Sequence, residues 1–352
     1  MGVPGPKLLE QVRGHLRLQG YSRRTEETYV NWIKGFLRFH RLQHPRNLRE
    51  PEIESYLTHL VLDRHYSASA QNQALSAILY LYAQVLEIEL SSRIESVRAR
   101  RSRRLPVVLS KAELKALFSK LSGSRLFLVR LLYGTGLRIE EFLNLRVKDI
   151  DFSNSRICIV GGKGGKDRFT ILPASMKTDL QAHIHRIEEI HRRDTANGRG
   201  SAFLPDRLGR KYRNLGKEFS WQFIFPAATI FCDRRTGNSG RWHISAGVIS
   251  TAIRSAAKTA KIRKHVTAHT LRHTFATHLL ESGTNLRVIQ ELLGHKSPET
   301  TMIYTHVVAN GASTTTSPVD SIAHVRCAAN YSFKRTAAAA RFPVMRRSAA
   351  AA

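Results

Sequence analysis

The sequence is poor in cysteine and has no long apolar run. Its three cysteines, Cys158, Cys232 and Cys327, lie far apart and form no CxxC pair. This spacing predicts a reducing compartment and no zinc knuckle. No stretch of 18 apolar residues and no signal peptide occurs, and Pro6 stands where a myristoylation signal needs Ser or Thr. We therefore expect a cytoplasmic protein without a membrane partner.

Acidic residues are also scarce. The chain has 27 Asp and Glu residues against 56 Lys and Arg residues, so its formal net charge is +29. Such a charge predicts a polyanionic partner, and a ribosomal-type or merely soluble basic protein is the alternative. A simple basic tail protein is excluded because 42% of the residues are hydrophobic. A length of 352 residues favours two domains, each with its own core.

The first 90 residues read as a wholly helical domain. Ser22 is a candidate N-cap, and apolar residues recur on one face of the helix that follows. Residues 91–108 lose this periodicity and become basic, which predicts an interdomain linker laid along phosphates. A solvated charge run describes any single arginine there almost as well. The linker residues expected to contact DNA are Arg100, Arg101, Arg103 and Arg104.

A second domain is expected over residues 109–311. Ser110 and Glu113 form a capping box, and the pattern predicts helices over 111–120 and 124–134. Further on, RICIV and RFTILP read as two strands joined by GGKGGKD. This loop is no P-loop, since a strand and not a helix follows it. A β-hairpin that brings Lys163 to DNA fits the pattern better.

Six side chains of this domain have the chemistry that attack on a phosphodiester requires. Arginine forks match phosphate oxygens bidentately and can stabilise the transition-state charge without a metal. A free tyrosine is only about 0.1% phenolate at neutral pH, and a cationic pocket favours the ionised form. Histidine or lysine can protonate the departing 5′ oxygen. The set, which implies no metal and no cofactor, is Arg138, Lys163, His269, Arg272, His295 and Tyr304.

Each of these residues alone has an ordinary explanation. His183 and Arg186 show that the HxxR spacing arises by chance in a chain with 16 histidines. Arg138 alone would suit a solvated helix, and Tyr304 alone a half-buried core. His295 follows a glycine and would suit a helix C-terminus. Only the joint order and spacing of the motifs argue against these explanations.

In that order and spacing the chain resembles the tyrosine recombinases. The boxes GTGLRxxE, GKGxKxR, HxLRHTFATHLLExG and LGHxxxxTTxxYTH follow one another along the sequence. Upstream, GYSRRTEETYVNWIKGFLRFH is similar to the helical core-binding domain that opens these proteins. The resemblance implies a mainly α fold with two domains, a helical DNA-clamping bundle and a helical catalytic domain with a small antiparallel sheet.

The resemblance also implies a role for each reactive side chain. Arg138 and Arg272 would hold the scissile phosphate, and Tyr304 would attack it to give a 3′-phosphotyrosine. The remaining residues would transfer protons or support the site, namely Lys163 as general acid, His269 and His295 in proton transfer and phosphate contacts, and Glu141 in orienting the site.

An aromatic segment at about residues 203–245 resembles the insertion of integron integrases. Its KYxNxxxExxWQxxFP pattern implies that Trp221, Trp242 and His243 stack on unpaired bases, at about 1–3 kcal/mol per base. Burial of Trp221 in the core is an equally good interpretation. Family members usually carry two histidines where this chain has Trp242 and His243.

The resemblance as a whole implies an integron integrase. Such an enzyme acts as a homotetramer on a double-stranded primary site and on folded single-stranded cassette sites. The alternatives are a phage-type or chromosome-resolving tyrosine recombinase on duplex sites, or a catalytically inactive DNA-binding relative. The family pattern thins after Tyr304, and residues 312–352 carry two alanine runs, so we expect this tail to be disordered.

Overall fold

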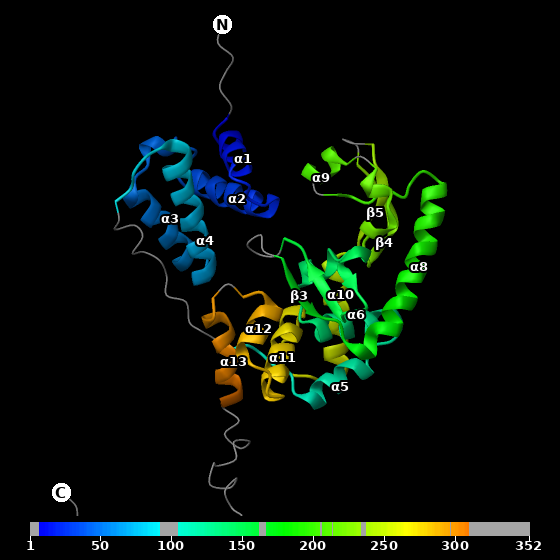
Figure 1. Ribbon diagram of the computed structural model, residues 1–352. Coiled ribbons are helices and arrows are strands. Elements are labelled where there is room, and N and C mark those ends of the chain that lie inside the picture. The colour runs from blue at the N-terminus through cyan, green and yellow to red at the C-terminus, as the bar shows by residue number, and fades with distance from the viewer. Residues whose placement is uncertain are drawn as a thin grey trace, which may run out of the picture. The chain divides into compact units, whose positions relative to one another are not determined.

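The computed structural model describes residues 7–91, 105–161, 167–204, 206–212, 214–233, 237–295 and 297–309. The chain divides into two compact units, residues 1–104 and 105–352 (Figure 1). Both units are mainly helical, and the second also contains two small antiparallel sheets, which confirms the predicted fold class. None of the helices in the described ranges is long and apolar enough to cross a membrane.

The first unit is a helical bundle with one hydrophobic core. Ser22 caps the second helix as predicted, because its Oγ accepts a hydrogen bond from the backbone N–H of Thr25. Ile33, Phe36 and Leu57 are fully buried in this core. The helices are α1 (Leu8–Leu18), α2 (Arg23–Phe39), the 3₁₀ turn η1 (Pro45–Asn47), α3 (Glu50–Leu62) and α4 (Ala68–Tyr80).

The last helix of this unit changes its geometry part-way. After α4 the chain continues as a wider π-helical turn, η2 (Leu81–Leu86). Tyr82 is buried in this turn, and its hydroxyl lies 2.9 Å from the backbone carbonyls of Pro45 and of Leu48. The π turn thus places a hydroxyl where it satisfies one carbonyl at the start of η1 and one at its C-cap.

The second unit begins with the predicted capping box. Ser110 Oγ accepts from the backbone N–H of Glu113, whose carboxylate accepts from the backbone N–H of Ser110. The helical elements are α5 (Lys111–Ser119), α6 (Gly123–Thr135), α7 (Ile139–Leu143), η4 (Val147–Asp149), η5 (Ala174–Met176), α8 (Lys177–Ala196), α9 (Asp206–Lys211), η6 (Leu215–Lys217), η7 (Phe219–Trp221), α10 (Ala246–Thr259), α11 (Ala268–Glu281), α12 (Leu286–Leu293) and α13 (Glu299–Ala309).

The two predicted strands form the centre of a three-stranded antiparallel sheet. They are β2 (Arg156–Ile159) and β3 (Arg168–Ile171), and the short β1 (Ile150–Asp151) adds an edge that the sequence pattern did not predict. Lys163, on the loop between β2 and β3, lies outside the described residues, as do the linker arginines Arg100, Arg101, Arg103 and Arg104 and the tail 312–352.

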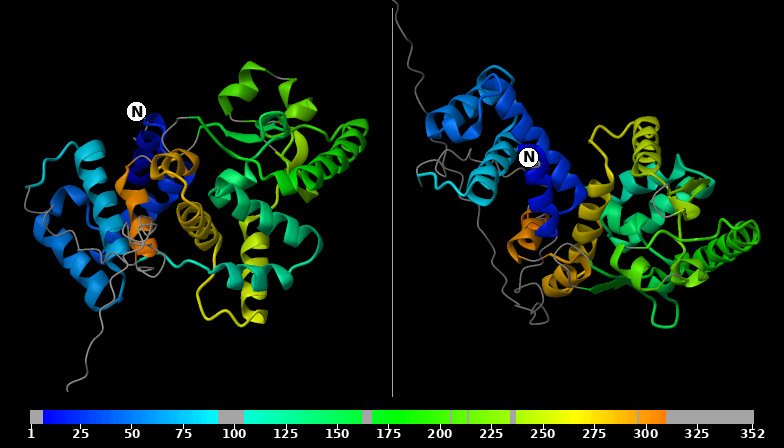
Figure 2. Two further views of the ribbon diagram at one scale, coloured as in Figure 1. Left: turned by 60° about the horizontal axis from the view of Figure 1, so that its bottom comes forward. Right: turned by 90° about the horizontal axis from the view of Figure 1, so that it is seen from above.

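A second hairpin, also missed by the sequence pattern, lies in the aromatic insertion. It pairs β4 (Pro226–Cys232) with β5 (Ser239–His243), and the register shifts between Pro226 and Ile230. Helix α8 extends away from the rest of the second unit (Figure 2) and carries this hairpin near its C-terminal end. Helix α11 packs against α6, α12 and α13, so the centre of the unit brings three sequence boxes together.

Candidate active site

Arg138 stands at the start of α7, directly after a glycine turn. Gly136 ends α6 with φ of 61°, and a Cβ at this position would collide with the Phe275 ring, so glycine is required on both grounds. Arg138 Nη1 donates to Glu141 Oε1 at 2.7 Å, and Nη2 donates to the Gly294 carbonyl at 3.3 Å. About a quarter of the Arg138 side chain stays exposed, so its guanidinium can still reach a ligand.

Arg272 is the largest fully buried side chain of the chain's described part. Its Nη1 donates to the Gly136 carbonyl at 2.8 Å and its Nη2 to the Leu293 carbonyl at 2.5 Å. Burial and the nearby Arg138 cation lower the pKa of Arg272 to about 10, so it stays charged at neutral pH. The two arginines are therefore fixed by the same backbone turns and carry adjacent positive charges.

Glu141 joins these arginines to a third one, which the sequence analysis did not assign to the site. Arg168 donates two hydrogen bonds to the Glu141 carboxylate, at 3.0 and 2.6 Å, and its Nε donates to the Leu292 carbonyl at 3.2 Å. Burial would raise the pKa of Glu141, but hydrogen bonds from Arg168 and Arg138 outweigh it and lower that pKa to about 2. Arg168 therefore supports the acidic residue that orients Arg138.

This carboxylate predicts a pH-dependent stability. A lowered folded pKa contributes stability above the ordinary pKa of glutamate, and this contribution is lost as the pH falls toward 2. Glu141→Gln should lower the free energy of unfolding at pH 7 by about 3 kcal/mol, and the difference from wild type should vanish near pH 2. Urea titrations at several pH values measure both effects, with the exposed Glu140→Gln as control. A loss of equal size at every pH would contradict the prediction.

Tyr304, on α13, lies next to these arginines and is almost completely buried. Only 1% of it is exposed, and its Oη lies 2.9 Å from Nδ1 of His273. Its ring stacks on that of His295 with centroids 6.2 Å apart and an interplanar angle of 18°. Burial raises the pKa of Tyr304, and the positive charges of Arg272 and Arg138 offset part of this rise. The phenol is therefore protonated at neutral pH.

Two further predicted histidines border the same site. His295 follows Gly294, which ends α12 in the left-handed region, and its Nδ1 lies 2.9 Å from Thr301 Oγ1. Burial and the cations Arg272 and Arg138 lower the pKa of His295 to about 3. Partial burial and the same cations also lower the pKa of His269. The structure thus brings Arg138, Arg272, His269, His295 and Tyr304 together with Glu141.

The predicted base-stacking residues lie on the insertion. Trp242 is 45% exposed and contacts Phe203, Phe223 and His243, with ring centroids 5.2, 5.7 and 5.6 Å away. Trp221 is half-buried. Lys148 Nζ lies 4.5 Å from the centroid of the Trp221 ring. Trp221 and Lys148 line a cavity of about 440 Å³ that also touches Glu141.

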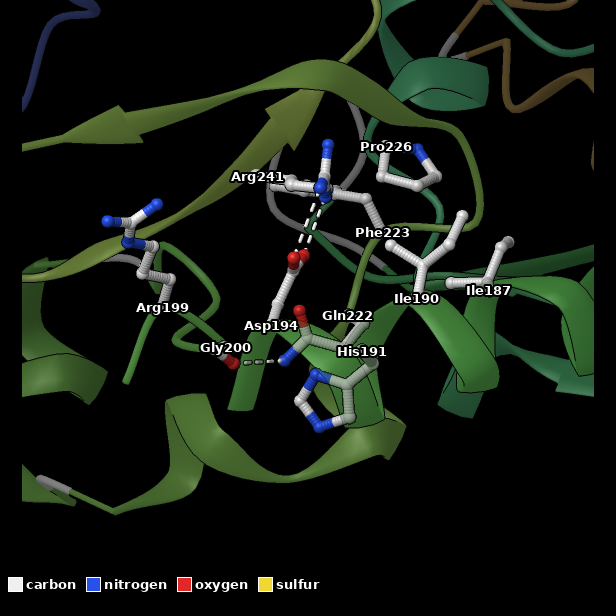
Figure 3. Close-up of a pocket in the computed structure, with 10 residues that line it drawn as sticks. All are labelled: Ile187, Ile190, His191, Asp194, Arg199, Gly200, Gln222, Phe223, Pro226 and Arg241. Carbon is white, nitrogen blue, oxygen red and sulfur yellow. Dashed lines mark hydrogen bonds and ion pairs between the residues drawn. The ribbon is translucent and has the colours of Figure 1, made fainter. Parts of the chain in front are cut away.

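Two arginines hold the insertion in place. Arg146 donates to the carbonyls of Trp221 and Phe203, and its guanidinium lies 4.4 Å from the Phe223 ring centroid. Arg241 of β5 donates from Nε and Nη2 to the Asp194 carboxylate of α8, at 2.6 and 3.1 Å (Figure 3). The aromatic residues of the insertion therefore sit on a frame fixed to both α8 and the segment after α7.

Comparison with known proteins identifies the family. Residues 107–310 match the model of the phage integrase family, and residues 8–92 match the phage integrase N-terminal SAM-like domain. The chain belongs to the phage integrase family. It is 43% identical over 316 residues to an integrase/recombinase of Escherichia coli, and these residues cover 90% of this chain and 94% of that relative.

This phage integrase-family chain also matches more distant recombinases. Tyrosine recombinase XerA of Thermococcus kodakarensis is 30% identical over 305 residues, covering 86% of this chain and 91% of the relative. The chain is therefore a tyrosine site-specific recombinase, an enzyme that breaks and rejoins DNA strands.

Solved structures share its fold at low identity. A lambda integrase dimer bound to a COC′ core site has a TM-score of 0.57 and 18% identity, covering 84% of this chain and 93% of that chain. The Tn1549 transposon integrase in complex with transposon right end DNA has a TM-score of 0.56 and 17% identity, covering 90% and 97%.

Proposed function

We propose that this recombinase is an integron integrase. It would integrate and excise gene cassettes, acting on folded single-stranded cassette sites and on a double-stranded primary site. The observation that carries the proposal is the aromatic insertion, which Arg146 and Arg241 hold beside the segment that bears Glu141. A recombinase that reads only intact duplex has no need for a tryptophan that borders a cavity together with Glu141.

The arrangement of the site supports cleavage by Tyr304 through a 3′-phosphotyrosine. Arg138 and Arg272 would bind the scissile phosphate, exchanging their contacts with backbone carbonyls for contacts with its oxygens. His269, His295 and Lys163 would assist in phosphate contacts and proton transfer. The phosphotyrosine keeps the energy of the broken bond, so religation would require no ATP and no other cofactor.

The net charge of +29 supports DNA as the partner. We propose that residues 1–90 and 109–311 clamp the duplex from two domains, that the basic stretch 91–108 lies along phosphates, and that four copies act on two paired sites. A lambda integrase tetramer bound to a Holliday junction, 18% identical with a TM-score of 0.56, provides an example of such an assembly in this fold.

The insertion has properties that suit an extruded base. Trp221 and Leu208 of the insertion border a cavity of about 440 Å³, otherwise lined by residues of the segments 140–149 and 158–161, and this volume falls within the range of small-ligand pockets. Trp221 provides an aromatic face in its wall, and Lys148, which is paired with Asp149 at 2.9 Å, lies beside that ring. Trp242 and His243 form a second aromatic patch that is linked to Arg146 through Phe223.

Substrate form tests the proposed function. The purified protein is incubated with the folded bottom strand of a cassette site and with a linear duplex of the same sequence, and covalent adducts are counted on denaturing gels. We expect the folded strand to be cut and the cassette duplex to be cut poorly. Preference for the duplex at both the cassette and the primary site would favour a phage-type or chromosome-resolving recombinase. An absence of adduct on every substrate would favour an inactive DNA-binding relative.

Trp221 provides a residue-level version of this test. Loss of one stacked base costs about 1–3 kcal/mol, so Trp221→Ala should weaken binding and cleavage of the folded site by about 5-fold to 150-fold. The duplex primary site should be nearly unaffected, because it has no extruded base. Trp221→Phe keeps an aromatic face and should retain most of the activity. An equal loss on both substrates would assign Trp221 to the core.

A further inference from the structure

The phenol of Tyr304 is hydrogen-bonded to an imidazole that neither the motif analysis nor the comparisons assign. His273 lies on α11 directly after Arg272, and its Nδ1 is 2.9 Å from Tyr304 Oη. Its ring is also 4.6 Å, centroid to centroid, from that of His269 at 87°. Tyr304 is 1% exposed, so bulk water has almost no access to the phenol proton.

The protonation states of the pair follow from their surroundings. Burial raises the pKa of Tyr304, so its phenolate is rarer than the roughly 0.1% of a free tyrosine at neutral pH. Burial, His269 and Arg272 lower the pKa of His273 to about 4, so this ring is neutral. A neutral imidazole has one nitrogen that accepts a hydrogen bond, and a protonated phenol has an O–H that donates one. We therefore assign the O–H of Tyr304 as donor and Nδ1 of His273 as acceptor.

We propose that His273 is the general base that accepts the phenol proton of Tyr304 during strand cleavage. The proposal rests on the proposed role of Tyr304 as nucleophile. In the step, the bond from Oη to phosphorus forms, the bond from phosphorus to the 5′ oxygen breaks, and the phenol proton moves to Nδ1. A separate acid protonates the 5′ oxygen. In religation each transfer runs backwards, and His273 returns the proton to the phenol.

The groups that face His273 support this assignment over its neighbours. From its own helix these are His269 and Arg272, from the end of α12 His295, and from α13 Tyr304. Within the described ranges, His295 Nδ1 contacts Thr301 and not the phenol, whereas His273 contacts the reacting oxygen itself. A bound phosphodiester would neutralise part of the charge of Arg272 and so make His273 a stronger base.

The test measures covalent trapping on a suicide substrate as a function of pH. His273→Gln can hold the phenol by a hydrogen bond but cannot take its proton. We expect adduct formation at pH 7 to slow by about 100-fold. The remaining rate should rise about tenfold per pH unit, because only the preformed phenolate then attacks, whereas wild type should change little from pH 6 to 8. A 5′-phosphorothiolate substrate, whose leaving group needs no acid, should not restore the rate.

The chain contains a matched control on the same helix. His278 Nδ1 lies 2.9 Å from the Tyr133 hydroxyl, so His278→Gln alters a similar histidine–tyrosine contact away from Tyr304. It should keep the pH profile of wild type. A loss in His273→Gln that is equal at every pH, or one that the phosphorothiolate restores, would overturn the role as base. Failure of wild type itself to form an adduct would instead overturn the proposed role of Tyr304.

Discussion

Tyr304→Phe should abolish the covalent protein–DNA adduct and leave DNA binding almost unchanged. The phenylalanine ring keeps its place against His295 and in the core around α11, and only the hydroxyl is lost. The lost hydrogen bond to His273 should change the free energy of unfolding by about 1 kcal/mol. Denaturing gels measure the adduct and mobility shifts measure binding. An adduct that persists in the variant would refute Tyr304 as nucleophile.

Tyr133→Phe is the matched control for this experiment. The Tyr133 hydroxyl lies 2.9 Å from Nδ1 of His278 on α11, and Tyr304 Oη lies at the same distance from Nδ1 of His273 on that helix. Removal of its hydroxyl costs a similar hydrogen bond in the same unit. The control should still form the adduct, which separates loss of the nucleophile from general loosening of the α11 packing.

Arg138→Ala should reduce the rate of cleavage by about 10³-fold and change DNA affinity by less than tenfold. Its guanidinium is held by Glu141 and Gly294. Its interaction with the phosphate should be strongest in the transition state, where negative charge grows on the phosphate oxygens. Affinity is shared among many basic side chains, so one arginine contributes little to it. Single-turnover cleavage and equilibrium binding, measured at one salt concentration, show whether the cleavage rate falls more than the DNA affinity. The exposed Arg287→Ala is the control. Equal losses in both quantities would mean that Arg138 only docks phosphate.

Arg272→Ala should show the same loss of cleavage together with a loss of stability. Arg272 is 1% exposed and donates to the carbonyls of Gly136 and Leu293, which would be left without these partners. The free energy of unfolding should fall by about 3–5 kcal/mol, a penalty that the part-exposed Arg138 does not carry. Comparison of the two variants in urea titrations therefore separates catalytic from structural contributions.

Local sequence signals predicted much of the fold correctly. The caps at Ser22 and Ser110 gave the starts of α2 and α5, and the alternation in RICIV and RFTILP gave β2 and β3. The β4–β5 hairpin was missed because the β4 segment, PAATIFC, is mostly apolar and shows no alternation of apolar and polar residues. The π turn η2 was missed because its stabilising contacts come from Pro45 and Leu48, far away in the sequence.

The candidate site was only partly predictable for a similar reason. Arg168 is the last residue of the GKGxKxR box, but its partner Glu141 lies 27 residues earlier, and no local pattern predicts that pair. His273 offered a stronger signal, since it lies four residues after His269 and therefore on the same face of α11. The spacing alone could not reveal that it, and not His269, contacts Tyr304.

The two ends of the β4–β5 hairpin lie side by side, since Pro226 pairs with His243 across its base. A segment whose two ends lie side by side can gain, lose or exchange residues at its far tip while its surroundings keep their positions. Evolution is thus free to vary the tip of this hairpin without disturbing the arginines gathered around Glu141.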